Sequence, residues 1–300
     1  MTIGGAARLT GEPCTVGSLL AEVRQRLLAA GVEPADHEAA WLIEHAIGLS
    51  GLRQVVDRRR VVSDTEAMKL AGLLSRRVAR EPLQYILGTQ EFCGLEFEVS
   101  PTVLIPRPET ERLIRELIRR LPPGKNPTLV DVGTGSGCLA VTLARSVRNG
   151  KVKAIDLSAS ALETAKRNAR RHGMEASITW LEGDLLAPLA GMSLERSVTA
   201  IVSNPPYIRE ADWPTLQPEV RLYEPRAALI GGPRGTEFHE RLLDEAIPFL
   251  IPGGLLVMEM GQGQSAALHA RVESMAAYRS VDVVRDEAGI DRVFIAKRAG

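Results

Sequence analysis

The sequence has few cysteines, no excess of either charge and no long apolar run. Its three cysteines form neither a metal-spaced pair nor a disulfide framework, which predicts a reducing, cytoplasmic setting: they are Cys14, Cys93 and Cys138. Thirty-seven basic residues balance thirty-seven acidic ones, which argues against a protein that binds nucleic acid through many phosphate contacts. No stretch approaches about 18 consecutive apolar residues, so no membrane span is expected.

Histidine pairs and phosphate-binding signatures are also missing. The five histidines are scattered without the spacing of metal ligands, so no metal site is expected. The chain has no Gly-Lys-Ser/Thr, which excludes a P-loop. Residues 1–14 lack the basic-then-apolar form of a signal peptide and are expected to be a flexible extension.

The rest of the chain is expected to divide into a helical part and an α/β part. Apolar residues at helical spacing predict helices over about residues 15–80, with caps at Asp36 and in a box of Ser63 and Glu66. Alternation around Gly94 predicts a hairpin. The predicted boundaries are a helical domain at 15–88, a hairpin linker at 89–111 and an α/β domain at 112–300.

Strands and helices alternate from Thr128 onward. Apolar runs predict strands at 128–132, 152–156, 177–181, 198–203 and 255–260, then a hairpin of 281–284 with 292–296. Ser160 and Glu163 are expected to form a capping box, and Thr110 or Glu109 to cap the helix at 112–120. This alternation predicts an α/β fold with a mostly parallel sheet and helices on both faces.

A glycine-rich turn follows the first of these strands. It reads Gly133-Thr134-Gly135-Ser136-Gly137 and leads straight into a helix-like stretch. A strand, a glycine turn and a helix in this order bring the backbone close to a nucleotide-like ligand. The second strand ends in Asp156, and a carboxylate at that offset suits a grip on ribose hydroxyls.

The most informative segment is Asn204-Pro205-Pro206-Tyr207, which follows the strand at 198–203. Proline has no N–H, so the carbonyls of this corner cannot all be satisfied by neighbouring strands. The Asn204 side chain and a neighbouring carbonyl are therefore free to accept hydrogen bonds from a planar NH2 group, which Tyr207 can cover. Ligands of parallel α/β sheets bind at this carboxyl edge.

Together these motifs resemble those of class I S-adenosylmethionine-dependent methyltransferases. More narrowly, from about residue 15 to 297 the chain is similar to the release factor glutamine methyltransferases. The matching segments are 81–88, Phe92-x-Gly94, 103–111, 131–137, 203–208, 224–225, 228–229, 231–232 and 252–254. The chain departs from the family where Arg234-Gly235-Thr236 replaces an Asp-Gly-Leu.

The resemblance implies a seven-stranded sheet with a reversed last strand, joined by the hairpin to a small helical domain that docks a protein substrate. It implies transfer of a methyl group from S-adenosyl-L-methionine to the side-chain N5 of a glutamine. That glutamine lies in the Gly-Gly-Gln motif of class 1 peptide chain release factors, so the reaction would support translation termination. No direct nucleic-acid or membrane partner is implied.

The resemblance also implies roles for individual residues. Asn204, Pro205 and Tyr207 would be catalytic, and Pro206 would complete the substrate-binding corner. The cofactor would be held by residues 133–137, Asp156, Asp184, Leu185 and Asn204. Asp184 would accept from the adenine amino group or cap a helix, with Leu185 against the ring.

For several acidic and polar residues, the sequence is compatible with two different roles. Asp131 either orients the glycine turn or is a satisfied strand-end carboxylate. Glu109 and Thr110 either reach the methionine end of the cofactor or cap a helix. Glu259 is expected to be buried near the site, without an assigned role.

Two rival functions fit part of the sequence. An adenine-N6 or guanine-N2 methyltransferase also handles a planar NH2 group, so the Asn-Pro-Pro-Tyr corner suits it too. Net neutrality and a helical N-terminal third without a basic recognition domain favour a protein substrate. A catalytically idle cofactor-binding scaffold is disfavoured by the intact glycine turn and Asn204.

Overall fold

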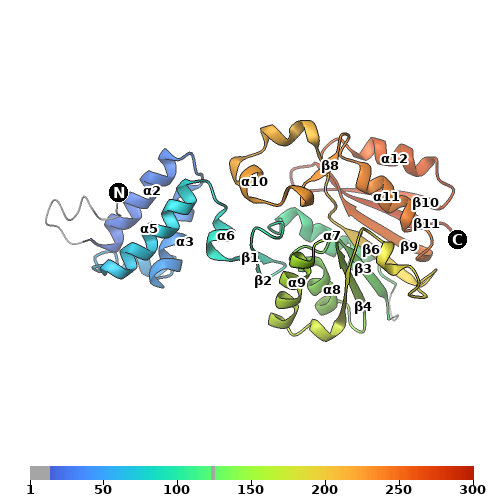
Figure 1. Ribbon diagram of the computed structural model, residues 1–300, viewed down its shortest axis with the longest axis horizontal. Helices are drawn as coiled ribbons and strands as arrows, with labels where there is room; N and C mark the ends of the chain where they lie inside the picture. The colour runs from blue at the N-terminus through green and yellow to red at the C-terminus, as the bar shows by residue number, and fades with distance from the viewer. Residues whose placement is uncertain (1–13, 123–125) are drawn as a thin grey trace. The chain divides into compact units, whose positions relative to one another are not determined.

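The computed structural model describes residues 14–122 and 126–300, which form two compact units (Figure 1). The helical unit contains Met1–Gly88 together with Gln217–Tyr223. The α/β unit contains Thr89–Leu216 and Glu224–Gly300. Of the extension predicted at 1–14, all but Cys14 lies outside the described residues.

The helical unit is built from short amphipathic helices around a leucine-rich core. They are α2 (Val16–Ala29), α3 (Ala35–Ile47), α4 (Gly51–Val56), α5 (Asp64–Val78), α6 (Leu83–Leu87) and α10 (Pro218–Tyr223). The predicted capping box of Ser63 and Glu66 is confirmed at the start of α5. The predicted cap at Asp36 is wrong: α3 begins after Pro34, so Asp36 lies in its first turn and pairs with Arg24.

The last of these helices, α10, comes from far along the chain and is anchored by a buried charge cluster. Glu219 on α10 accepts hydrogen bonds from Arg77 at 3.0 Å and from Arg80 at 2.7 Å. Arg77, which is only 5% exposed, also donates to both carboxylate oxygens of Glu38. Tyr223 adds a bond from its hydroxyl to the Ala79 carbonyl at 2.7 Å. These bonds explain why α10 belongs to the helical unit.

The α/β unit contains one large sheet and two small ones. The large sheet has seven strands in the order β10-β11-β9-β6-β3-β4-β5. These strands are β3 (Thr128–Val132), β4 (Lys151–Asp156), β5 (Ile178–Glu182), β6 (Val198–Ser203), β9 (Leu250–Glu259), β10 (Tyr278–Arg285) and β11 (Asp291–Arg298). Only β11 runs against its neighbours, which confirms the reversed last strand.

The small sheets are the predicted hairpin and a parallel pair. The hairpin joins β1 (Thr89–Phe92) to β2 (Leu95–Glu98), and both turn residues, Cys93 and Gly94, have positive φ. The pair consists of β7 (Ile208–Arg209) and β8 (Ile230–Gly232). Short 3₁₀ helices are η1 (Pro108–Thr110), η2 (Glu175–Ser177), η3 (Ala187–Leu189), η4 (Glu210–Thr215) and η5 (Arg226–Ala228).

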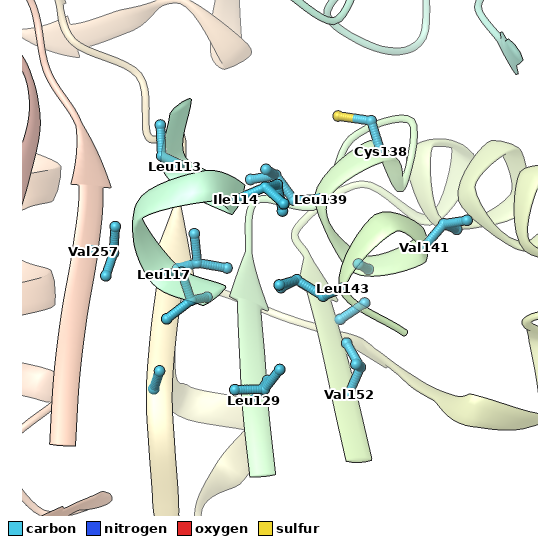
Figure 2. Close-up of a cluster of buried hydrophobic side chains, with 14 of the residues drawn as sticks. Leu113, Ile114, Leu117, Leu129, Cys138, Leu139, Val141, Leu143, Val152 and Val257 are labelled. Carbon is cyan, nitrogen blue, oxygen red and sulfur yellow. The ribbon is translucent and has the colours of Figure 1, made fainter. Parts of the chain in front are cut away.

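Helices cover both faces of the large sheet, as predicted. On one face, residues of α7 (Glu111–Arg120) and α8 (Cys138–Ser146) pack on Leu129, Val152 and Val257, as Figure 2 shows, and α9 (Ala159–Arg171) joins the same core. On the other, α11 (Glu237–Glu245) and α12 (Ser265–Glu273) pack on alternate residues of the same strands. Within residues 14–122 and 126–300, every helix is too short or too polar to traverse a lipid bilayer.

Two predicted helix caps in this unit are wrong. Helix α9 begins at Ala159, so its cap is Ser158, which accepts from the Ala161 N–H, and not Ser160. Neither Thr110 nor Glu109 caps α7, because η1 leads directly into the helix and Thr110 has helical backbone angles. The Thr110 hydroxyl is therefore available for another partner.

Candidate active site

The register of the parallel strands aligns four candidate residues at the carboxyl edge of the sheet. Pairing across β4, β3, β6 and β9 puts four residues in one row: Ile155, Val132, Ser203 and Met258. The residues that follow them are Asp156, Gly133, Asn204 and Glu259. Because neighbouring strands lie about 4.8 Å apart, this second row spans roughly 15 Å. The glycine turn and the Asn-Pro-Pro-Tyr corner thus start side by side.

The glycine turn leaves its backbone uncovered above the sheet. Gly133 and Gly135 have φ of 72° and 55°, and a Cβ at either would meet nothing closer than 4.0 Å. Gly137 has a different role, because a Cβ there would lie 2.9 Å from the Ala165 Cβ. It allows α8 to approach α9, whereas the first two glycines leave room for a ligand against the main chain.

The fully buried Asp131 fixes the turn and the start of α8 through hydrogen bonds. Its Oδ2 accepts from the Thr134 hydroxyl at 2.7 Å and the Ala140 N–H at 3.0 Å. Burial raises the pKa of Asp131 to about 7, although these two hydrogen bonds oppose the rise. Its Oδ1 and the Ser136 hydroxyl have no partner among the described residues. Asp131 therefore orients the turn, which was one of its two predicted roles.

Asp156 lies beside the turn and keeps unused acceptor capacity. Its two oxygens accept from the Gly135 and Ser158 N–H groups at 2.8 and 2.9 Å. Burial raises its pKa, opposed by these backbone bonds. A carboxylate offers about four lone-pair sites, so roughly two remain for further donors such as ribose hydroxyls.

Asp184 is placed differently from the other candidate acids. It lies two residues beyond the end of β5, and its half-exposed carboxylate forms an ion pair with Arg241 at 2.7 Å. It caps no helix, because η3 begins at Ala187 without a side-chain cap. Leu185 follows with φ of 44° and packs against the core under α11. The adenine contacts of this pair stay a prediction.

At the other end of the row, Asn204 belongs to a chain of hydrogen bonds. Its Nδ2 donates to the Thr110 hydroxyl at 3.2 Å, and that hydroxyl donates to Glu259 Oε2 at 2.6 Å. The other Glu259 oxygen accepts from the Tyr207 hydroxyl at 3.1 Å. Among the described residues, no donor reaches Asn204 Oδ1 or the Pro205 carbonyl. The corner therefore presents two unused acceptors.

Glu259 and His239 lie behind the corner in a buried setting. Glu259 is 1% exposed, and burial raises its pKa, opposed by the Thr110 and Tyr207 hydrogen bonds and by Arg292. His239 donates from Nε2 to the Glu259 carbonyl at 2.8 Å, while its Nδ1 has no partner in the described part of the chain. Burial lowers the His239 pKa to about 4, so the ring is neutral at physiological pH.

The segment that departs from the family pattern packs against the back of the corner. A Cβ at Gly235 would lie 2.4 Å from the Tyr207 carbonyl, so only glycine fits there. Gln264 donates to the carbonyls of both Tyr207 and Gly235. The flanking Arg234 and Thr236 turn to acidic residues of α11 instead. Relative to the family's Asp-Gly-Leu, this chain therefore keeps the glycine, Gly235, and differs only in the residues on either side of it.

The roles of Thr110 and Glu259 were among those that the sequence left open. These two residues are 149 positions apart, so no local motif joins them. The available signal was that Glu259 ends a strand at the same sheet edge as Asn204.

Comparisons with known proteins identify the family of this chain. The chain matches family models described as the PrmC N-terminal domain, at residues 18–88, and the methyltransferase small domain, at residues 111–216. A release factor glutamine methyltransferase of Geobacter sulfurreducens is 43% identical over 94% of this chain and 96% of its own length. One of Moorella thermoacetica is 42% identical over 95% of this chain and 99% of its own. The chain belongs to the release factor glutamine methyltransferase family.

Solved structures support the fold of this family member. A methyltransferase from Pyrococcus furiosus superposes with a TM-score of 0.51 and 23% identity, covering 70% of this chain and 91% of its own. The hMettl16 catalytic domain, solved with an RNA hairpin, gives 0.55 at 15% identity and covers 79% and 84%. At these identities the likeness concerns the fold alone. As a release factor glutamine methyltransferase by sequence, the chain is a methyltransferase enzyme.

Proposed function

We propose that this protein transfers the methyl group of S-adenosyl-L-methionine to the side-chain N5 of a glutamine in a protein. The proposed substrate is the Gly-Gly-Gln motif of class 1 peptide chain release factors. The names of relatives more than 40% identical over nearly the whole chain support a release factor glutamine as the substrate. The proposed setting is the cytoplasm, and the proposed partner of the helical unit is the release factor.

The observation that carries the proposal is the pair of unused acceptors at Asn204 and Pro205, beside the open glycine turn. An NH2 group has two hydrogens, and two acceptors can hold both at once. The nitrogen lone pair then points out of the plane of those two bonds. Since β3 and β6 are neighbours, Gly133, over which we propose that the methyl donor binds, lies at the same edge as this corner.

The residues of the turn fit the proposed cofactor. Gly133 and Gly135 leave backbone open to a ligand, and Asp156 has acceptors to spare for ribose hydroxyls. Asp184 and Leu185 are proposed for the adenine, with Thr134, Ser136 and Gly137 completing the turn. When bound, the cofactor supplies an electrophilic methyl group on a positively charged sulfur.

The protein residues make a weak nucleophile reactive mainly by holding it. An amide nitrogen shares its lone pair with the carbonyl, and the rotation barrier of about 18–20 kcal/mol measures that delocalisation. Asn204 Oδ1 and the Pro205 carbonyl would stabilise a partly pyramidal NH2 and fix its direction, while Tyr207 covers the amide plane. Such positioning and preorganised hydrogen bonding contribute several kcal/mol.

No side chain is required as a general base. The methylated amide nitrogen is positively charged and loses its extra proton readily to water. The buried His239 is occupied by the Glu259 carbonyl and faces the back of the corner, so it has no proposed part in proton transfer.

The proposal is tested by giving the protein methyl-labelled S-adenosylmethionine with one candidate substrate at a time. The substrates are a class 1 release factor, the same factor with alanine for the Gly-Gly-Gln glutamine, tRNA, rRNA and DNA. We expect label on the first alone. Label on a nucleic acid and none on the release factor would instead support the amino-group methyltransferase of nucleic acid.

A further inference from the structure

The hydrogen bonds of Thr110 give the Asn204 carboxamide a defined orientation. The three linked side chains come from three elements of the α/β unit: Thr110 ends η1, Asn204 follows β6 and Glu259 ends β9. The Thr110 hydroxyl lies 2.6 Å from Glu259 Oε2 and 3.2 Å from Asn204 Nδ2. Thr110 is 3% exposed and Glu259 is 1% exposed, so the bond between these two side chains is shielded from water.

The direction of each bond follows from counting protons. An ionised carboxylate only accepts, so the single hydroxyl proton of Thr110 must point to Glu259. The Thr110 oxygen is then left with lone pairs alone, and it can only accept from Asn204. Its neighbour on Asn204 must therefore be the NH2 end of the carboxamide. The oxygen end is turned the other way, to the unused-acceptor side of the corner.

We propose that Thr110 and Glu259 are positioning residues that hold Asn204 Oδ1 toward the substrate amide. The inference rests on the proposed function, because it explains how a carboxamide with a donor end and an acceptor end presents only the acceptor. Without Thr110, the Asn204 side chain can turn over and offer its NH2 group to another NH2 group. That orientation repels the substrate nitrogen.

The same carboxylate also fixes the second side of the corner. Tyr207 donates to the other oxygen of Glu259 at 3.1 Å, so one buried acid holds both Asn204, through Thr110, and the aromatic ring. A protonated Glu259 would donate to Thr110 and free the threonine proton for Asn204 Oδ1, which reverses the orientation. Burial is the largest influence and raises the pKa of Glu259, and Glu109 adds to the rise, whereas the Thr110 and Tyr207 hydrogen bonds and Arg292 oppose it. The proposed orientation is that of the ionised acid.

Thr110→Val is the sharpest test, since it removes the hydroxyl and keeps the shape of the side chain. We expect kcat for the release factor to fall at least about tenfold, because small misplacement of a reacting group costs that much or more. The KM for the release factor and the Kd for S-adenosylmethionine should stay within about twofold. Thr110→Ser keeps the hydroxyl and should restore most of kcat.

A matched control is available in α8. Thr142 is also a buried threonine, at 4% exposure, but its hydroxyl has no partner among the described residues. Thr142→Val should leave kcat and both binding constants unchanged. Thermal unfolding of all three variants shows that each is folded.

A second readout needs neither cofactor nor substrate. In the free protein, the two protons of the Asn204 carboxamide should give well-separated NMR signals, since one is donated to Thr110. Thr110→Val should shift the signal of the proton that is donated to Thr110 and so narrow the separation, and Thr142→Val should not. A Thr110→Val protein with wild-type kcat and unchanged Asn204 signals would overturn the inference. If instead the wild-type protein labels no release factor, the proposed function fails while the NMR comparison still tests the orientation.

Discussion

Buried charge in the helical unit and at the candidate site of the α/β unit is stabilised in different ways. In the helical unit, Arg77 is 5% exposed and is met by two carboxylates, Glu38 and Glu219. In the α/β unit, Asp131 and Glu259 are equally buried, yet their hydrogen bonds come only from neutral hydroxyl and N–H groups.

The consequences appear in the pKa values. Although burial lowers it, the bonds to Glu38 and Glu219 leave the pKa of Arg77 above its usual value. Burial raises the pKa of Asp131 to about 7 and also raises that of Glu259. The paired charge of Arg77 stabilises the fold. Asp131 and Glu259 have no directly bonded cation, and they lie next to the glycine turn and the Asn-Pro-Pro-Tyr corner, the two segments proposed to bind the ligands.

The largest expected effect comes from breaking the balanced cluster. Arg77→Met leaves the buried Glu38 and the partly buried Glu219 without their shared partner, and breaking a buried pair in this way costs about 3–5 kcal/mol. We expect the free energy of unfolding in denaturant to fall by that amount. Arg24→Met is the control, because its pair with Asp36 is largely exposed and is worth about 0–1 kcal/mol. Equal effects of the two changes would refute the contrast between them.

Asn204→Ala should give the next largest effect, on turnover and not on stability. Removal of one preorganised hydrogen-bonding group lowers kcat about 10²- to 10³-fold, or about 2.7–4 kcal/mol of activation free energy. Calorimetry should show S-adenosylmethionine binding close to wild type. Unchanged turnover on the release factor would exclude the carboxamide from the reaction.

Asp156→Asn should weaken cofactor binding, since a hydrogen bond to a charged group contributes about 1.5–3 kcal/mol. The expected Kd by calorimetry rises roughly tenfold or more. Asp184→Asn provides the comparison, and we expect a smaller rise because the Asp184 carboxylate is half-exposed and already binds Arg241. The reverse order would assign the main cofactor contact to Asp184.

The last prediction concerns Asp131 and pH. Its pKa is about 7 in the native protein and near 3.8 when unfolded, so between these values the native state binds more protons. The free energy of unfolding therefore falls as pH rises from about 4 to 7, by at most about 1.4 kcal/mol per unit. Asp131→Asn lacks this loss, so the free energy of unfolding of the variant relative to wild type should rise over that window and then level off. A constant difference would show that burial does not shift this pKa.

Much of the fold was predictable, because its signals are local. Apolar runs located the strands of the large sheet, and the glycine turn and the Asn-Pro-Pro-Tyr corner stand where parallel strands end. Register could not be predicted, and it is register that places Glu259 beside Asn204. Helix starts were mispredicted at Asp36 and Ser160, because Pro34 and Ser158 set those starts two residues earlier.

The path of the chain was also beyond prediction. Nothing in residues 217–223 signals that Glu219 bonds to Arg77 and Arg80, over 130 positions away. Charge pairs at such separation depend on the tertiary fold. The sequence therefore assigned this segment to the α/β domain, while the structure groups it with the helices.

The polypeptide crosses between its two units three times, after Gly88, Leu216 and Tyr223. If a protease cut the chain once after Gly88, the N-terminal fragment should stay bound to the rest of the protein. Arg77 and Arg80 of that fragment would still bond to Glu219 on α10. A shortened protein that begins at Thr89 would keep α10 but lack Arg77 and Arg80, so Glu219 would lose both of its cationic partners. The helical unit therefore cannot be separated from the α/β unit by one cut, because residues 217–223 also belong to it.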